Sequence, residues 1–139
     1  MVYFIDSNIF LRTLIKDNIQ QHQACIKLLR LIKDNKIKAI TGTIVIAKIV
    51  WTLNSYYKLD KEDITTAVQS IINLRGLTII DNYDHFLTLN LYKSHSVKYI
   101  DALIASIPAV QTQKITIVTY DNDFNKLVVK RLKPDQIQS

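Results

Sequence analysis

Short β-rich runs alternate with longer helical patterns along this chain, and that alternation limits the folds open to it. The strand candidates are VYFI (2–5), IKAIT (37–41), LTII (77–80) and ITIVTY (115–120). Helical patterns cover 7–15, 22–34, 43–57, 64–74, 82–94, 97–107 and 121–128. Strands that alternate with helices predict an α/β fold in three layers, with a mainly parallel central sheet flanked by helices.

The sequence contains no repeat, low-complexity tract or linker, so we expect a single domain over residues 1–139. Asp60 and Asp63 resemble a capping arrangement in front of the helical pattern at 64–74, and Gly76 is placed to end that helix.

The amino-acid composition and the lengths of the apolar runs argue against several classes of protein. The single Cys25 excludes an internal disulfide and a cysteine-based metal site. The longest uncharged run, 102–113, falls short of the ~20 apolar residues needed to span a bilayer, and Asp6 interrupts the first apolar run too early for a secretory signal. We therefore expect a cytoplasmic protein without a membrane partner.

The charge balance favours an anionic partner. Lys and Arg number 18 against 12 Asp and Glu, which gives a net charge of +6. An excess of this kind is typical of proteins that bind nucleic acid or acidic protein segments. The seven tyrosines are scattered along the sequence and form no aromatic ladder that would indicate base stacking.

Two aspartates follow strand candidates at corresponding places. Asp6 comes directly after VYFI, and Asp121 comes directly after ITIVTY. Ligands of an open parallel sheet bind beyond the carboxyl ends of its strands, so these two acids can converge on one crevice. An aspartate in front of a helix is also a common N-cap residue. Capping explains each aspartate equally well alone, whereas the pair favours a site.

Asp101 lies in a mostly apolar helical pattern, VKYIDALIASI. A carboxylate on such a helix is seldom buried without a partner, so it either faces solvent or points into the crevice of Asp6 and Asp121. We favour the crevice. Three carboxylates in one place repel one another unless a cation neutralises them, and oxygen-only ligands select Mg²⁺ or Mn²⁺ rather than zinc. Such an ion activates water and stabilises charge on a phosphodiester, which predicts hydrolysis of a nucleic-acid backbone.

Four segments carry these residues in a recognisable order: YFIDSNIFLR (3–12), TIVIAKIVWTL (43–53), YIDALIAS (99–106) and IVTYDNDF (117–124). The ordered set resembles the PIN-domain ribonucleases and, at this chain length, their VapC-type toxins of toxin–antitoxin modules. The resemblance implies a parallel sheet flanked by helices and Mg²⁺- or Mn²⁺-dependent endonucleolytic cleavage of RNA. It also implies a homodimer, and inhibition by a cognate antitoxin that inserts a peptide near the acidic pocket.

The resemblance assigns roles to the acids. Asp6, Asp101 and Asp121 match carboxylates of the family that serve in catalysis and hold the metal ion, and Asp123 matches an additional acid that is often present.

Polar residues around the acids match as well. Ser7, Asn8 and Thr119 match positions that orient the acids or a bound water. Arg12 stands where a basic residue could meet a phosphate, although an ordinary arginine on a helix surface explains it equally well.

The second segment departs from the family pattern at Lys48, where a glutamate is usual. Lys48 shares a helical stripe with Val45, Thr52 and Ser55, the only polar stripe of an otherwise apolar helix, which must face water or a polar crevice. Glu62 is the only glutamate in the chain, and it lies in the first turn of another predicted helix, where it complements the helix dipole.

An ammonium group in place of a carboxylate changes the local charge by two units. At ~4 Å a pair of unit charges interacts by ~4 kcal/mol at an effective dielectric of 20. Our hypothesis is that Lys48 acts within the catalytic site by pairing with Asp6, Asp101 or Asp121, and that it impairs this chain as an enzyme. Natural divergence and an inactivating substitution both account for it.

Three other function classes share some of these sequence features. A non-catalytic PIN-like module that binds RNA or an antitoxin is the main alternative, because Lys48 would permit binding without chemistry. A receiver-like signalling domain predicts a cluster of adjacent acids after the first strand, where this chain has a single acid followed by Ser7 and Asn8. A phosphatase of the DxDxT type requires a second aspartate where this chain has Asn8.

Overall fold

The computed structural model describes residues 1–138, and its centre is a five-stranded sheet in which every neighbouring pair is parallel. The strand order is β3-β2-β1-β4-β5. The strands are β1 (Val2–Ile5), β2 (Lys38–Thr41), β3 (Leu77–Ile79), β4 (Ile115–Val118) and β5 (Arg131–Leu132). The chain builds outward from β1 to β3 and then crosses to β4 on the other side of β1. The strand order therefore reverses between β1 and β4, the place where open α/β sheets bind ligands.

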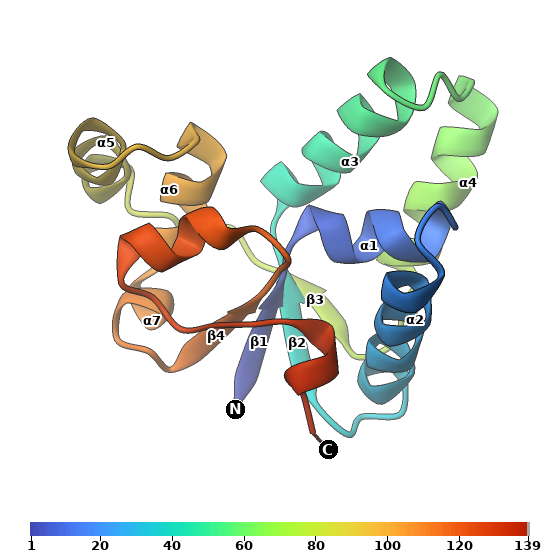
Figure 1. The fold of residues 1–139 in the computed structure, drawn as a ribbon, viewed down its shortest axis with the longest axis horizontal. Helices are drawn as coiled ribbons and strands as arrows, with labels where there is room; N and C mark the ends of the chain where they lie inside the picture. Colours follow the sequence, from blue (N-terminus) through green and yellow to red (C-terminus); the bar gives the residue numbers. More distant parts are fainter. Residues whose placement is uncertain (139) are drawn as a thin grey trace.

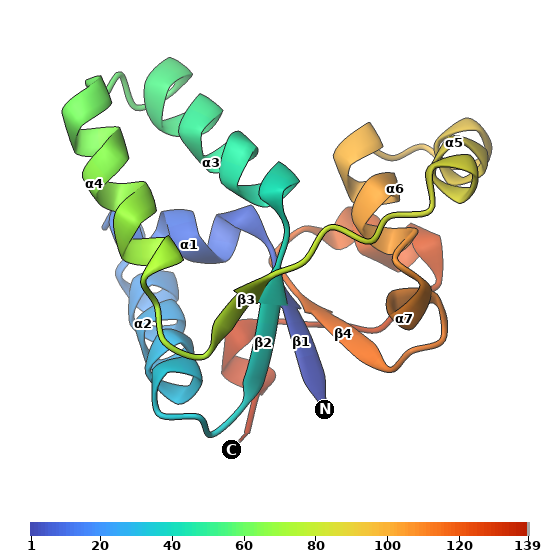
Figure 2. The same ribbon diagram turned by 180° about the vertical axis from the view of Figure 1, so that it is seen from behind.

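Helices flank this sheet on both sides (Figure 1). Figures 1 and 2 both show the first four helices gathered on one side of the molecule and the next three on the other. They are α1 (Ser7–Leu14), α2 (Ile19–Lys33), α3 (Thr43–Ser55), α4 (Lys61–Ile72), α5 (His85–Ser94), α6 (Tyr99–Ala105) and α7 (Pro108–Gln111), with 3₁₀ turns η1 (Asn122–Leu127) and η2 (Pro134–Gln136). The predicted α/β class with a parallel central sheet is confirmed.

The core packs the middle of the sheet against these helices. All four residues of β4 and the last two of β1, Phe4 and Ile5, are buried. Phe10 of α1 and Phe124 of η1 are fully buried as well. A central parallel strand that is apolar on both faces is the expected consequence of helices covering both sides. This packing fixes the carboxyl ends of β1 and β4 next to each other.

Several boundaries differ from the sequence prediction. Helix α2 begins at Ile19, three residues earlier than predicted, because the Asn18 side chain accepts a hydrogen bond from Gln21 N at 3.0 Å. Strand β4 ends at Val118, so a connecting segment separates it from Asp121. Strand β5, helix α7 and turn η2 were not predicted, since elements of two to four residues carry no periodic pattern.

Helix α4 is capped by Asp60 as predicted, but it begins three residues before the predicted pattern and ends two residues before its end. The Asp60 side chain accepts from Asp63 N at 2.9 Å and caps the helix. The helix ends at Ile72, so Gly76 is not its terminal glycine. Gly76 instead lies in the turn before β3, with a φ of 90°.

Among residues 1–138 no helix combines the length and the apolar character that crossing a bilayer requires.

Gly76→Ala is expected to lower the free energy of unfolding by about 1–3 kcal/mol, because an L side chain is strained at this positive φ and its Cβ would meet the backbone oxygen of Ile32. Urea unfolding followed by circular dichroism measures the change. Gln69→Ala, on the exposed face of α4, is the control and should stay within about 0.5 kcal/mol of the wild type. Equal midpoints for Gly76→Ala and the wild type would contradict the strain argument.

Candidate metal centre

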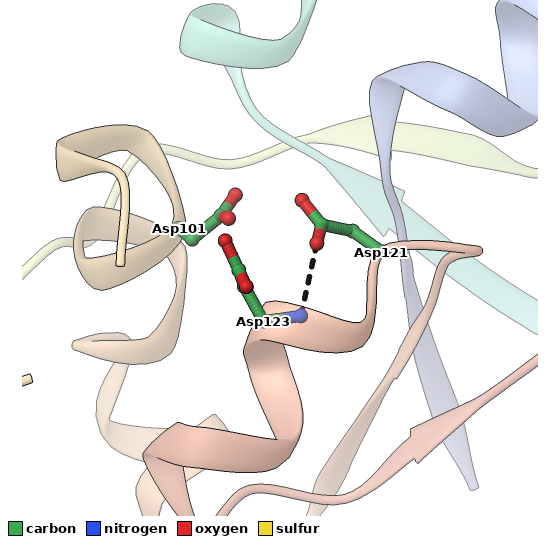
Figure 3. Close-up of side chains that lie close together, drawn as sticks. All are labelled: Asp101, Asp121 and Asp123. Atoms are coloured by element: carbon green, nitrogen blue, oxygen red, sulfur yellow. Dashed lines mark hydrogen bonds between the residues drawn. The ribbon is translucent and has the colours of Figure 1, made fainter. Parts of the chain in front are cut away.

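Three aspartates form a cluster where α6 meets η1. Asp101 lies in the first turn of α6, Asp121 is the N-cap of η1, and Asp123 lies in its first turn. One carboxylate oxygen from each lies within 4.8 Å of the other two. Figure 3 shows the three side chains pointing toward one shared space between the two elements. Residues twenty positions apart in the sequence are thus brought together by the packing of α6 on η1.

Asp101 is the most unusual member of this acidic cluster. Its side chain is fully buried, and neither carboxylate oxygen has a hydrogen-bond partner. Burial, followed by the negative charges of Asp121 and Asp6, raises the pKa of Asp101 to about 7. The alternative in which Asp101 faces solvent is therefore wrong. A buried carboxylate costs free energy unless it is protonated or paired, and Asp101 has no hydrogen bond that would offset this cost.

Lys98 supplies a positive charge at the edge of the acidic cluster. Its Nζ donates to Asp121 Oδ2 at 2.8 Å and lies 3.8 Å from Asp101 Oδ2. Burial alone would raise the pKa of Asp121, but the hydrogen bonds from Lys98 and from the backbone N–H of Asp123 outweigh it and lower that pKa. Lys98 is 57% exposed, so the ion pair stands open to water on one side.

Asp6 lies beside the acidic cluster but uses its oxygens differently. One oxygen accepts from Ser7 N at 2.7 Å, and the other accepts from Thr119 Oγ1 at 2.7 Å and from Asn8 Nδ2 at 3.3 Å. Burial raises the pKa of Asp6, and these hydrogen bonds offset part of that rise. The charge of Asp121 raises the same pKa further, so the two acids interact.

The Thr119 hydroxyl joins the two strand ends. It donates to Asp6 Oδ2, accepts from Asn8 Nδ2 at 2.9 Å, and accepts from Asp121 N at 3.0 Å. Asn8 also accepts from Tyr120 N through Oδ1 at 3.1 Å. Ser7, the buried first residue of α1, contributes its backbone N–H to Asp6. These polar residues set the positions of Asp6 and Asp121 relative to each other.

The capping and site interpretations of the two strand-end acids are compatible. Asp6 is the N-cap of α1 and accepts from Ser7 N, while Asp121 is the N-cap of η1 and accepts from Asp123 N at 2.9 Å. Each cap uses one oxygen. Capping holds each acid at the carboxyl end of the sheet and leaves the other oxygen for further partners.

Sequence reasoning missed Lys98 and two further basic residues at this edge. Arg131 of β5 donates from Nε to the backbone oxygen of Asp121 at 3.0 Å and from Nη2 to Asn122 Oδ1 at 2.6 Å, which holds the loop that carries the acid. Lys126 pairs with Asp123 at 3.2 Å. For Lys126 the only sequence signal was its i, i+3 spacing from Asp123 on one helical turn. No pattern in the sequence indicated the role of Arg131.

Lys48 is placed differently from our hypothesis. It is half-buried on α3, and its charge lowers the pKa of Asp6. Within residues 1–138 its ammonium group makes no ion pair with Asp6, Asp101 or Asp121 at 4.0 Å or less. The predicted ion pair is therefore wrong: Asp101 and Asp121 are paired with Lys98, the residue directly before α6, and both oxygens of Asp6 accept hydrogen bonds from other residues.

Arg12 is turned away from the acids. Its Nη1 pairs with Asp17 at 2.8 Å, and its backbone oxygen lies 2.8 Å from His22 Nδ1. Both charged groups of the pair are partly exposed, so the contact is an ordinary surface ion pair.

The residues present fit a hard divalent cation. The acidic cluster offers only carboxylate oxygens, which suits Mg²⁺ or Mn²⁺. The two unpartnered oxygens of buried Asp101 are the part of the site that the protein itself leaves without compensation. Asp101, Asp121 and Asp123 are the residues that would hold such an ion, with Asp6 next to them.

Comparison with known proteins matches residues 3–130 to the PIN domain. The chain belongs to the PIN domain family. Three solved structures share the fold of this PIN domain. VapBC2 from Rickettsia felis, solved bound to a DNA fragment from the promoter, superposes with a TM-score of 0.69 at 22% identity, over 96% of this chain and 98% of that chain. PAE2754 from Pyrobaculum aerophilum gives a TM-score of 0.67 at 10% identity, over 97% and 90%.

The third structure is VapC20 from Mycobacterium tuberculosis, described as a sarcin-ricin loop cleaving toxin. It gives a TM-score of 0.64 at 15% identity, over 95% of this PIN domain and 99% of that chain. At these identities the three structures show a common fold. No curated protein sequence matches the chain.

The buried carboxyl of Asp101, which has no hydrogen-bond partner, predicts a specific pH dependence. The folded chain keeps the Asp101 proton up to about pH 7, whereas the unfolded chain releases it near 3.8. The folded state thus binds more protons between these values, and its stability falls as the pH rises from about 4 to 7. Asp101→Asn removes this loss, so in EDTA at pH 8 it should be more stable than the wild type by a few kcal/mol.

Thermal unfolding of both proteins in EDTA at several pH values measures this difference. The two melting temperatures should converge toward pH 4, where the wild-type carboxyl is protonated in both states. A constant difference across the pH range would contradict the raised pKa of Asp101.

Proposed function

We propose that this chain, as a single PIN-like domain over residues 1–139, is a metal-dependent endoribonuclease of the VapC toxin type that cleaves RNA phosphodiester bonds. The observation that carries the proposal is the buried Asp101 carboxyl, whose two oxygens lack partners inside a cluster of three aspartates. Membership in the PIN domain family and the net charge of +6 support the choice of RNA as substrate.

The chain's own residues prepare the site for this chemistry. Asp101, Asp121 and Asp123 would hold Mg²⁺ or Mn²⁺, and when bound such an ion lowers the pKa of water and stabilises negative charge on the phosphodiester. Thr119 and Asn8 hold the Asp6 carboxylate in one orientation at the edge of this space. Asp6 is the acid best placed to orient or accept a proton from the attacking water, because its neighbours fix it by hydrogen bonds.

The toxin assignment implies protein partners. VapBC2 and VapC20 are the names of structures that share this fold. By analogy we propose that the chain forms a homodimer, is inhibited by a cognate antitoxin, and acts in the cytoplasm, the compartment of its proposed substrate. Arg12 would contact a phosphate only after leaving Asp17, so we propose no substrate role for it in this conformation.

Lys48 is proposed to reduce catalysis through Asp6. Its positive charge favours the ionised form of Asp6 and occupies the place where the family usually has a glutamate. The loss of one acidic group at this edge weakens the negative field that would attract the cation.

A non-catalytic RNA- or antitoxin-binding module is the second candidate function. The observation in its favour is that two ammonium groups, those of Lys98 and Lys48, lie near acids that a metal ion would otherwise neutralise. In that case the protein binds RNA without cleaving it.

Lys48→Glu is expected to raise Mg²⁺- or Mn²⁺-dependent cleavage of RNA by on the order of tenfold or more, because it restores an acid beside Asp6. Cleavage of labelled single-stranded RNA on denaturing gels measures the rate. Lys48→Gln removes only the positive charge and should give an intermediate rate. Lys61→Glu makes the same change of charge on the exposed surface of α4 and should leave the rate unchanged.

Two outcomes would overturn these statements separately. Equal rates for the wild type and Lys48→Glu would refute the role of Lys48. No metal-dependent cleavage by either protein, with RNA binding retained, would replace the ribonuclease with the binding module.

Asp101→Asn is expected to abolish cleavage in the most active of these variants and to remove the thermal stabilisation that Mn²⁺ gives the parent protein. Asp17→Asn, which alters only the surface contacts of Asp17 with Arg12 and Tyr57, is the matched control and should retain both properties. Stabilisation by Mn²⁺ that is equal with and without Asp101 would show that the ion binds elsewhere.

A further inference from the structure

A second feature adjoins the acidic cluster, and its tyrosines have no role in the mechanism described above. It is a cleft of about 800 Å³ at the junction of α5 and α6. Its lining includes Tyr92, Lys93, His95, Lys98, Tyr99 and Asp123, and we call it the tyrosine cleft. Asp123 belongs to the acidic cluster and Lys98 pairs with Asp121, so the cleft opens directly beside the candidate metal centre.

Two aromatic rings form the most distinctive part of the tyrosine cleft. Tyr92 near the end of α5 and Tyr99 at the start of α6 lie with ring centroids 5.6 Å apart and an interplanar angle of 74°. They are 50% and 42% exposed. Tertiary structure thus brings together two of the tyrosines that look scattered in the sequence, and it leaves ring surface of both accessible to a ligand.

Hydrogen bonds to backbone oxygens hold the turn between α5 and α6, which forms part of the cleft, in place. Lys126 of η1 donates to the backbone oxygen of Ser96 at 3.0 Å while it pairs with Asp123. His95 Nδ1 lies 3.0 Å from the backbone oxygen of Leu91, and Val97 N donates to the backbone oxygen of His95 at 3.0 Å. The turn between α5 and α6 is therefore tied to both its neighbours, so the cleft needs little rearrangement to accept a ligand.

The charges around the cleft suit a ligand that carries phosphate. Lys93 and Lys98 line it, and both are exposed. Asp123, the single acid of the lining, is already paired with Lys126. A ligand that combines a flat ring with a nearby phosphate matches aromatic surface flanked by ammonium groups, and a nucleotide of single-stranded RNA has both parts.

We propose that the tyrosine cleft binds one nucleobase of single-stranded RNA, next to the phosphodiester that faces the acidic cluster. The base stacks on Tyr99, whose ring is held in place by the edge-to-face contact with Tyr92, and Lys93 and Lys98 contact the adjoining phosphates. The proposal rests on the proposed function, since it names a subsite for the same substrate. It assigns these tyrosines to substrate positioning, and the chemistry stays with the acids.

Binding of a short fluorescent single-stranded RNA, measured by anisotropy, tests the proposal. The parent protein carries Asp101→Asn, which prevents cleavage during the measurement. Tyr99→Ala in this parent should weaken binding by about tenfold, the usual effect of losing one stacked base, and Tyr92→Ala should weaken it as well, because it removes the contact that holds the Tyr99 ring. Tyr99→Phe keeps the ring and should bind like the parent. Tyr56→Ala removes an exposed tyrosine of the α3 end and serves as the matched control.

Two further measurements separate stacking from charge and from misfolding. An RNA with an abasic unit at the stacked position should bind the parent and Tyr99→Ala equally, because the ring then has no base to contact. Inorganic polyphosphate should compete equally against both proteins. Equal melting temperatures show that the variants are folded.

The outcomes distinguish this proposal from the one on which it rests. If the parent binds RNA and the tyrosine variants bind it equally well, the tyrosine cleft is not a base-binding site and the ribonuclease proposal stands. If neither the parent nor the wild type binds RNA, both proposals fall. If the tyrosine variants change the oligomeric state in light scattering and leave RNA binding intact, the tyrosines belong to a protein interface and the cleft proposal is wrong.

Discussion

Mutual repulsion among carboxylates is the constraint around which this site is built. Oxygens of Asp101, Asp121 and Asp123 lie within 4.8 Å of one another, and two charges at that distance repel by about 3 kcal/mol at an effective dielectric of 20. The protein compensates two of these acids closely and the third only weakly. Asp121 receives Lys98 at 2.8 Å and Asp123 receives Lys126 at 3.2 Å, whereas buried Asp101 has no hydrogen bond, lies 3.8 Å from Lys98 and has its pKa raised to about 7. The cost of that arrangement is what a bound cation would remove.

Sheet topology makes the gathering of acids possible at this edge. Strand β1 lies between β2 and β4, and the strand order reverses there. The segments that follow β1 and β4 therefore leave the sheet at adjacent positions. The Thr119 hydroxyl connects these two segments through hydrogen bonds to the Asp6 carboxylate and to the backbone N–H of Asp121. Ile5 and Val118, the last residues of β1 and β4, are buried apolar residues directly before these polar residues. The core therefore fixes the positions of the polar residues.

The sequence predicted features that depend on local pattern or on strand direction. The strands of the central sheet followed from β-rich runs, and the gathering of acids at one edge followed from the rule that parallel strands end together. Contacts between elements were not predictable. Lys98 meets Asp121 across 23 positions, Arg131 belongs to a two-residue strand without any periodic signal, and Tyr92 meets Tyr99 only because α5 turns into α6. The helical phase of Lys48 did not reveal that its ammonium group forms no ion pair with Asp6, Asp101 or Asp121, because the position of a long side chain depends on contacts with other elements.

The two lysines near the acids, Lys98 and Lys48, act on different carboxylates. Lys98 contacts the acidic cluster directly and is largely exposed, so its ammonium group can move into water when a divalent ion takes over the same oxygens. Lys48 is half-buried and acts at a distance on Asp6, whose carboxylate is already fixed by Thr119 and Ser7. Under the proposed function, Lys98 would compete with a divalent ion for the carboxylate oxygens, whereas the positive charge of Lys48 would stay beside Asp6. Lys48 is thus the charge that an exchange of ligands at the acidic cluster would leave in place.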